Sequence, residues 1–412
     1  MADILTQPNA SGAQSLHLSR SVYTPAPELL PMLQQNDTSS EVLMKSKGLL
    51  TIALGVFGAL AALSQAPAQG QRQGPGVQAP QDSRYQALIA TCKNPPPPRG
   101  GGPGQPAAAA QGAQVRGAAP AQGAPPAAQQ GPREYKVTEI PGVIAAGQQW
   151  KTIWQASGNV ADGIVGTNDG GLLIAQNDKS DVLKLDKDGK ESVAYMDTNT
   201  GGSVSINSKG AVFIVQRGLN QAVWQLAPQR KMLANKSQDD PLDCIGGVIN
   251  DLTADSKGGV YFTMGGLFYA SPSGVVTRYG ENLRTNGVIL SPDEKTVYVT
   301  NGPALAAFDV QPDGSLKNQR EFVKFEGNGD GSTVDSAGRI YVTSNTPGIH
   351  VIGSDGKYLG LIPTPRNVIS TAFSGPDKKT LYAVVSYGPR ESLQAEIIAI
   401  PMIAQGYKGR PK

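Results

Sequence analysis

A short unit that recurs six times constrains the fold of this chain more than any other feature of its sequence. Five of the six copies open with Asp or Asn, and each continues through an apolar stretch and a turn into a β-rich strand. A third apolar segment follows each copy, as in residues 182–185 and 222–226. Repetition at this period is typical of arrays and propellers. The copies begin at residues 162, 202, 250, 286, 330 and 367.

Three or four short strands in each unit, with no amphipathic helix between them, predict an all-β fold and specifically a six-bladed β-propeller. Each copy supplies one blade. Residues 135–140 lead into the first copy. We expect this segment to complete the last blade and close the ring, because closure removes exposed sheet edges. The propeller is expected to form one domain over residues 134–405.

The sequence before the repeats predicts an exported protein. Residues 44–68 combine a basic start, an apolar run and a close of small residues near Ala68, a pattern typical of a cleaved secretory signal peptide. A membrane anchor is the alternative, but the run is shorter than the ~20 residues that span a bilayer. We therefore expect a periplasmic or extracellular protein with no stable membrane span after cleavage. Because signal peptides begin at the initiator methionine, Met44 is the predicted start and residues 1–43 a mis-called extension.

Between the leader and the repeats, residues 69–133 are a low-complexity tract of Pro, Ala, Gly and Gln. The tract lacks the apolar residues that would offset the cost of ordering it, so it is predicted to be a disordered linker. It contains Cys92, and Cys244 is the only other cysteine. In an oxidising compartment these two can form a disulfide, and two free thiols are the alternative.

Composition excludes several classes of function. Two cysteines and two histidines cannot supply a zinc, haem c, iron–sulfur or thioredoxin-type site. The formal net charge of +3 gives no electrostatic argument for a nucleic-acid partner. Any metal is therefore expected to be bound by oxygen. The sequence carries no signal for an oligomeric state.

The polar residues that open the copies are the candidate site. In a propeller the innermost strand of each blade lines the central channel, so residues that enter these strands converge on one axis. Carboxylate and amide oxygens in such a ring suit Ca²⁺, which takes about six to eight oxygen ligands. The alternative is that the Asn-Gly and Asp-Gly pairs are turn residues chosen for backbone geometry. The five candidates are Asp162, Asn250, Asn286, Asp330 and Asn367.

Three of these residues stand in longer motifs. Asn250-Asp251 precedes a strand that ends at residues 261–263, Asn286-Gly287 precedes residues 291–293, and Asp330-Gly331 precedes Asp335. A closing motif follows at residues 373–382. With these motifs, the region from about residue 155 to 400 resembles the SMP-30/gluconolactonase/LRE-like family of six-bladed, calcium-dependent β-propellers.

The resemblance implies roles for the ring. Asp162, Asn286 and Asp330 would bind Ca²⁺ or another divalent cation, and Asp330 would also be the general base. Asn250 would orient water or substrate, with Asn367 as a second substrate-binding residue. The chain departs from the family at two positions: Asp162-Gly163-Ile164 replaces Glu-Gly-Pro, and Val248 replaces an arginine often found there.

The leading hypothesis is thus an exported, calcium-dependent hydrolase of lactones or esters. The cation would polarise the carbonyl while a carboxylate activates water. The alternative is a non-catalytic propeller that binds a ligand or a protein partner, with a structural metal, and both departures favour it. A lyase-like propeller would need a histidine in the channel. His350 falls on a third-strand segment and is predicted to be structural, and His17 lies in the extension.

Overall fold

The computed structural model describes residues 83–95, 131–410 and 412. The predicted extension at 1–43, the signal peptide at 44–68 and most of the linker at 69–133 lie outside the described residues. Within the described part of the chain, no helix has the length and apolar character needed to cross a membrane.

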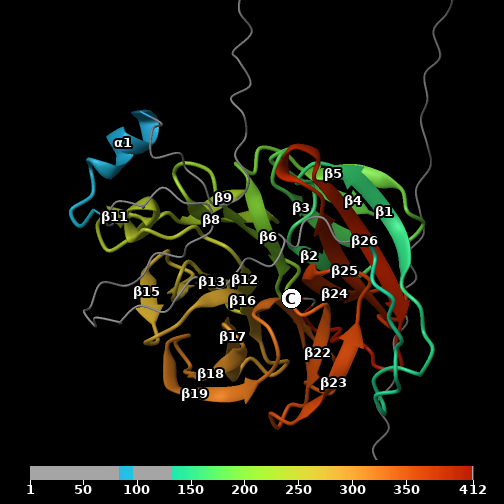
Figure 1. Ribbon diagram of the computed structural model, residues 1–412. Helices are drawn as coiled ribbons and strands as arrows, with labels where there is room; N and C mark the ends of the chain where they lie inside the picture. The colour runs from blue at the N-terminus through green and yellow to red at the C-terminus, as the bar shows by residue number, and fades with distance from the viewer. Residues whose placement is uncertain (1–82, 96–130, 411) are drawn as a thin grey trace, which may run out of the picture. The chain divides into compact units, whose positions relative to one another are not determined.

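Six four-stranded antiparallel sheets make up the domain, which confirms the predicted all-β, six-bladed β-propeller (Figure 1). Blade 1 contains β2 (Ile164–Gly166), β3 (Leu172–Gln176), β4 (Asp181–Leu185) and β5 (Glu191–Tyr195). Blade 2 contains β6 (Gly201–Ile206), β7 (Val212–Gln216), β8 (Ala222–Ala227) and β9 (Lys231–Ala234). Blade 3 contains β12 (Leu252–Ala254), β13 (Val260–Thr263), β14 (Leu267–Ala270) and β15 (Val276–Tyr279).

The second half of the ring repeats this plan. Blade 4 contains β16 (Thr285–Leu290), β17 (Thr296–Asn301), β18 (Ala304–Val310) and β19 (Leu316–Lys324). Blade 5 contains β20 (Gly329–Val334), β21 (Ile340–Ser344), β22 (Gly348–Ile352) and β23 (Tyr358–Pro363). Blade 6 contains β24 (Val368–Ser374), β25 (Thr380–Tyr387), β26 (Gln394–Pro401) and the early strand β1 (Lys151–Ser157), and a 3₁₀ turn, η3 (Arg390–Ser392), connects β25 to β26.

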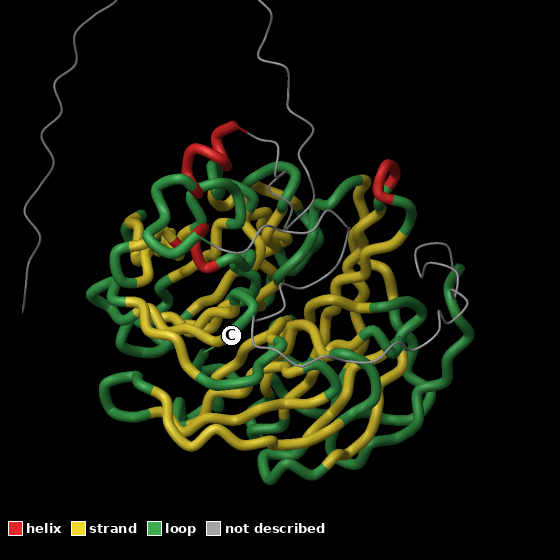
Figure 2. The backbone as a smooth tube through the Cα atoms, turned by 60° about the vertical axis from the view of Figure 1, so that its left-hand side comes forward, coloured by secondary structure: helices red, strands yellow, loops and turns green. Residues whose placement is uncertain are grey.

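The innermost strands form a closed ring. In order around the axis, β2, β6, β12, β16, β20 and β24 each contact the next, and β24 returns to β2. Figure 2 shows the strands arranged around this axis. The apolar side chains of each blade are buried against the neighbouring blades, so the core consists of clusters between sheets rather than one central cluster.

The strand that closes the ring is not the one expected from the sequence. Lys151–Ser157 pairs antiparallel with β26 and becomes the outer strand of blade 6. Residues 135–140 form no strand, and Ile140 makes only an isolated bridge with Ile144. Val137 and Ile140 are buried in the cluster of blades 5 and 6. The two side chains therefore pack into the core between blades 5 and 6 instead of belonging to a paired strand.

The glycines that follow the ring residues have a packing role and not a turn role. Neither Gly163 nor Gly287 has a positive φ. A Cβ on Gly287 would lie 2.1 Å from the Asp330 carbonyl oxygen, and one on Gly163 would lie 2.6 Å from the Ser203 Cα. Glycine at these positions allows the innermost strands of two blades to approach closely. The turn interpretation of these Asp-Gly and Asn-Gly pairs is therefore wrong.

A short N-terminal segment is attached to the propeller by a disulfide. The helix α1 (Ser83–Ile89) leads to Cys92, which is bonded to Cys244 in the 3₁₀ turn η2 (Leu242–Ile245) with a Cα–Cα distance of 5.6 Å. The N–H of Lys93 donates to Asp240 Oδ1 at 2.7 Å, in the small hairpin of β10 (Lys236–Ser237) and β11 (Asp240–Pro241). Of the two states that the sequence allows for the cysteines, the structure has the disulfide.

Candidate functional site

All five candidate residues lie where an innermost strand begins, in blades 1, 3, 4, 5 and 6. The second strand of the same blade holds the backbone N–H of three of them. Asp162 donates to Ala175 O at 3.1 Å, Asn250 to Thr263 O at 2.8 Å, and Asn286 to Thr300 Oγ1 at 3.1 Å. These bonds fix the backbone of the three residues at the start of their innermost strands.

One arginine connects three of these residues into a chain of contacts. Arg217 forms an ion pair with Asp162 and also contacts Asn250 Oδ1. Its Nε donates to Ile249 O at 3.1 Å, and its Nη2 donates to Asn250 O at 2.9 Å. Asn250 Nδ2 in turn donates to Asn286 Oδ1. The guanidinium therefore fixes the positions of two candidate residues directly and of a third through Asn250.

Sequence reasoning missed Arg217. It follows directly after β7, the second strand of blade 2, and its side chain is 4% exposed. A charged residue at the end of the apolar run 212–215 is unusual, and this was the available signal. The sequence also has no arginine at Val248, where the family often has one. In this chain a cation reaches Asn250 from the neighbouring blade instead.

Asp330 has a different environment from the rest of the ring. Its carboxylate makes no hydrogen bond or ion pair with any other described residue. Burial raises the pKa of Asp330 to about 8, and the negative charges of Asp162 and Asp251 add to the shift. A carboxyl group with such a pKa can change its protonation state near neutral pH, as a general base must.

The charges of the ring favour a cation. Three carboxylates, those of Asp162, Asp251 and Asp330, act on one another, and only Arg217 and Lys412 offset them. One negative charge is left without a partner. No group of three or more His, Cys, Asp or Glu side chains among the described residues is arranged as metal ligands. A cation here would therefore depend on amide oxygens as well as on Asp162 and Asp330, and this donor set fits a hard cation such as Ca²⁺.

The remaining candidates are less connected. Asn367 precedes β24, and its Oδ1 atom is buried with no hydrogen-bond partner among the described residues. No contact links Asn367 to the other ring residues within the part of the chain described. His350 is buried on β22, where Nδ1 lies 3.0 Å from the Tyr358 hydroxyl and Nε2 lies 2.9 Å from Glu326 O. Burial lowers the pKa of His350, in keeping with a structural histidine.

Together, the fold and the ring define a six-bladed β-propeller with a polar site at the mouth of its channel. Residues 198–387 match the SMP-30/Gluconolactonase/LRE-like region, so the family resemblance is confirmed over this part of the chain. Among curated proteins, the chain is 29% identical to a gluconolactonase of Zymomonas mobilis, over 34% of this chain and 48% of the relative. It is 31% identical to the lactonase drp35 of Staphylococcus saprophyticus, over 44% and 56%.

A third relative is the pentonolactonase XacC of Haloferax volcanii, at 32% identity over 36% of this chain and 56% of the relative. The chain thus spans about half the length of the curated relatives it matches. A gluconolactonase structure from Xanthomonas campestris aligns with 69% of this chain and 98% of its own length, with a TM-score of 0.54 and 23% identity. A luciferin-regenerating enzyme aligns with 63% and 98%, with a TM-score of 0.52 and 17% identity. These structures support the fold.

Proposed function

We propose that this protein hydrolyses lactones at the mouth of the propeller channel. The observation that carries the proposal is Asp330, a half-buried carboxyl group of the ring with a raised pKa and no hydrogen-bond partner among the described residues. The names of the relatives, which include a gluconolactonase, a lactonase and a pentonolactonase, support this class of substrate. Esters of similar shape are a further substrate class, because they present the same carbonyl group.

The reaction that the ring can perform is a two-step hydrolysis. Water attacks the carbonyl carbon of the lactone while the Asp330 carboxylate accepts a proton from it. The ring C–O bond then breaks, and the proton on Asp330 passes to the departing alkoxide oxygen, which gives a hydroxy acid. Asn250 is positioned to orient the water or the substrate, because Arg217 and Asn286 hold both ends of its amide.

The residues that would hold a divalent cation are Asp162, Asn286 and Asp330. Ca²⁺ is our proposed occupant, and another hard divalent cation is the alternative. When bound, such an ion supplies Lewis-acid polarisation of the carbonyl and stabilises the oxyanion. A positive charge at this place would also offset the repulsion among the carboxylates that raises the pKa of Asp330.

A second candidate function is the binding of a ligand or a protein partner without catalysis. The observation that favours it is the position of Arg217. Its guanidinium already contacts Asp162 and Asn250, two of the residues that the catalytic hypothesis assigns to the metal and the substrate. In that case the ring would hold a structural metal, and the loops at the channel mouth would select the ligand.

Export to the periplasm or the extracellular space is also part of the proposal. It rests on the signal-peptide pattern of residues 44–68 and on the disulfide between Cys92 and Cys244. Disulfides form and persist mainly in oxidising compartments.

The test is the substitution Asp330→Ala, with Asp188→Ala as the control. Asp188 is an exposed aspartate that pairs only with the adjacent Lys187. We expect Asp330→Ala to lower cation-stimulated turnover of a small lactone by about 1,000-fold or more, because the general base is lost. Its circular dichroism spectrum should match that of the wild type, and Asp188→Ala should retain full turnover. Unchanged turnover in a folded Asp330→Ala protein would refute the assignment.

A further inference from the structure

The last residues of the sequence enter the central channel from the end opposite to the ring. After β26 the chain crosses beneath blades 5 and 6, where Gly406 bridges to Asp335 and its N–H donates to Lys378 O at 2.8 Å. A Cβ on Gly406 would lie 2.1 Å from the Phe373 Cβ, so the path is closely packed. Figures 1 and 2 both place the chain end in the middle of the ring.

Arg410 lies at the lower level of the channel and is 1% exposed. Its Nη1 donates to Thr253 Oγ1 at 3.0 Å, and its Nη2 donates to the carbonyl oxygens of Leu290 and Ser291 at 2.7 and 3.1 Å. Its Nε lies 3.7 Å from Glu294 Oε1. These contacts join the innermost strands of blades 3 and 4, so Arg410 anchors the segment.

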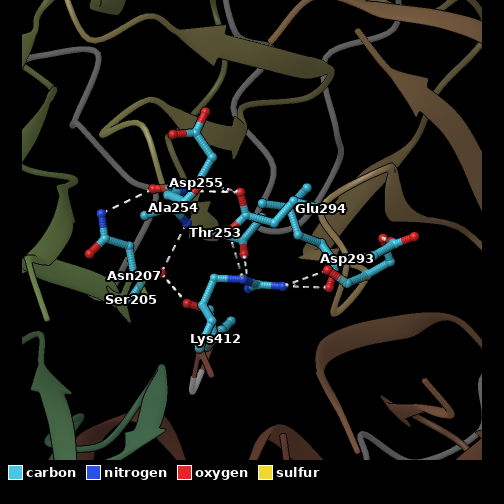
Figure 3. Close-up of polar contacts among 12 residues, drawn as sticks. Ser205, Asn207, Thr253, Ala254, Asp255, Asp293, Glu294 and Lys412 are labelled. Carbon is cyan, nitrogen blue, oxygen red and sulfur yellow. Dashed lines mark hydrogen bonds and ion pairs between the residues drawn. The ribbon is translucent and has the colours of Figure 1, made fainter. Parts of the chain in front are cut away.

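Lys412 reaches one level higher, directly beneath the ring. Its carbonyl oxygen accepts a hydrogen bond from Ser205 Oγ (Figure 3). Its Nζ lies 2.7 Å from Asp251 Oδ1 and 3.4 Å from Ser203 Oγ, and the residue is 1% exposed. Asp251 is the neighbour of Asn250 in the sequence. A buried ammonium group from the end of the chain is thus paired with a carboxylate next to a ring residue.

Asp251 connects this ion pair to the ring. Its Oδ2 accepts a hydrogen bond from the Val288 N–H at 3.0 Å, and its Oδ1 accepts one from Ser203 Oγ. Val288 stands two residues after Asn286. Asp251 therefore joins the innermost strands of blades 2, 3 and 4 just below Asn250 and Asn286. Removal of one partner from a buried ion pair leaves a costly unpaired charge, so loss of the Lys412 ammonium group would leave the buried Asp251 carboxylate without its cation.

We propose that Lys412 is a positioning residue for the lactonase site, acting through Asp251 to hold the ring strands of blades 3 and 4 in register. The expected effect of Lys412 on turnover rests on the proposed function. The expected effect on the register of the two strands does not. Lys412 then acts on the site through Asp251, and no hydrogen bond or ion pair joins it to a ring residue among those described.

The experiment compares Lys412→Met with Lys408→Met. Lys408 lies in the same segment and is exposed, so it is a matched control. The first readout is amide hydrogen exchange of the full chain, followed in a peptide that contains Val288. We expect Lys412→Met to speed exchange there by about tenfold or more, because the acceptor of that N–H is no longer held. Lys408→Met should exchange like the wild type.

The second readout is turnover of a lactone. A shift of about 1 Å in a site can cost about 100-fold in rate. We expect Lys412→Met to lower kcat by about tenfold or more while KM changes less than about threefold.

The double variant Asp251→Asn with Lys412→Met has no unpaired charge and keeps an acceptor for the Val288 N–H. The double variant should therefore recover part of the lost protection of the Val288 N–H and part of the lost kcat. If Lys412→Met alone does not fold, the double variant is compared with the wild type in its place.

The outcomes separate the two proposals. If the wild type hydrolyses no lactone, the proposed function fails, and hydrogen exchange at Val288 still decides the role of Lys412. Exchange at Val288 that is unchanged in Lys412→Met would overturn the inference. The same holds if an active wild type and a folded Lys412→Met protein have equal kcat, or if the double variant recovers nothing.

Discussion

The two ends of the propeller channel use buried charge in opposite ways. At the lower end, Arg410 and Lys412 direct their charged groups to carbonyl, hydroxyl and carboxylate oxygens of three blades. At the upper end, Asp330 is half-buried, and no other described residue donates a hydrogen bond to its carboxylate. The first arrangement joins strands, whereas the second leaves a charge uncompensated.

This difference shows which end is available for chemistry. A satisfied polar network stabilises one structure and has nothing left to offer a ligand. An unpartnered carboxyl group with a raised pKa is instead costly to the fold and is typical of functional sites. Arg217 combines features of both ends of the channel. It is buried and well bonded, as Arg410 and Lys412 are, but it contacts residues of the ring.

Of the substitutions that test this difference between the two ends, we expect that of Arg217 to have the largest effect on turnover. Arg217→Met removes the cation that holds Asp162 and Asn250, and we expect about a 100-fold loss of lactone turnover. The free energy of unfolding should also fall by about 3 kcal/mol, because Asp162 loses its buried partner. Kinetic assays and urea denaturation measure the two effects, with Arg284→Met, an exposed arginine, as the control. Wild-type turnover in Arg217→Met would mean that the guanidinium does not organise the ring.

Substitution of Arg410 should separate stability from activity. Arg410→Met leaves the carbonyl groups of Leu290 and Ser291 without their donor, and we expect the free energy of unfolding to fall by about 2 kcal/mol. Turnover by the folded protein should change less than in Lys412→Met. Thermal denaturation measures the loss of stability, and the lactone assay measures turnover, with Lys408→Met as the control for both. A large loss of kcat at full stability would place Arg410 with the ring instead of the anchor.

The comparison can also be sharpened through the pH dependence of stability in the presence of a chelator. The folded-state pKa of Asp330 is raised to about 8, so between about pH 4 and pH 8 the folded protein keeps a proton that the unfolded chain releases. This group therefore makes the folded state less stable as pH rises through that window. Asp330→Asn cannot titrate, so its stability should fall less than that of the wild type. Parallel unfolding curves from pH 5 to pH 8 would contradict the assigned pKa.

Much of the fold could be predicted from the sequence because its signals are local. All six copies became blades, since alternation within each strand and the Asp or Asn before each turn act over a few residues. Asp255 shows this, as its Oδ1 accepts the N–H groups of Lys257 and Gly259 in the turn after β12. The closing strand was missed because residues 135–140 and 151–157 are both rich in β-branched and aromatic residues, and the choice between them depends on pairing with the distant strand β26.

The site was predicted less completely for the same physical reason. Asp162, Asn250, Asn286 and Asp330 were identified because they share one position in the repeat. Arg217 and Lys412 have no counterpart in the other copies, and they reach the channel only through tertiary packing. Gly406 illustrates the difficulty: the space that requires glycine there is filled by Phe373, a residue of β24 that is distant in the sequence.

The most direct test of the central claim is turnover of a panel of small lactones and esters by the wild-type protein. The assay would be run as purified, with a chelator, and after addition of Ca²⁺ in excess of the chelator. We expect hydrolysis of at least one lactone, a loss with the chelator and recovery with Ca²⁺. Absence of hydrolysis across the panel in the presence of Ca²⁺ would contradict the account and favour the ligand-binding propeller.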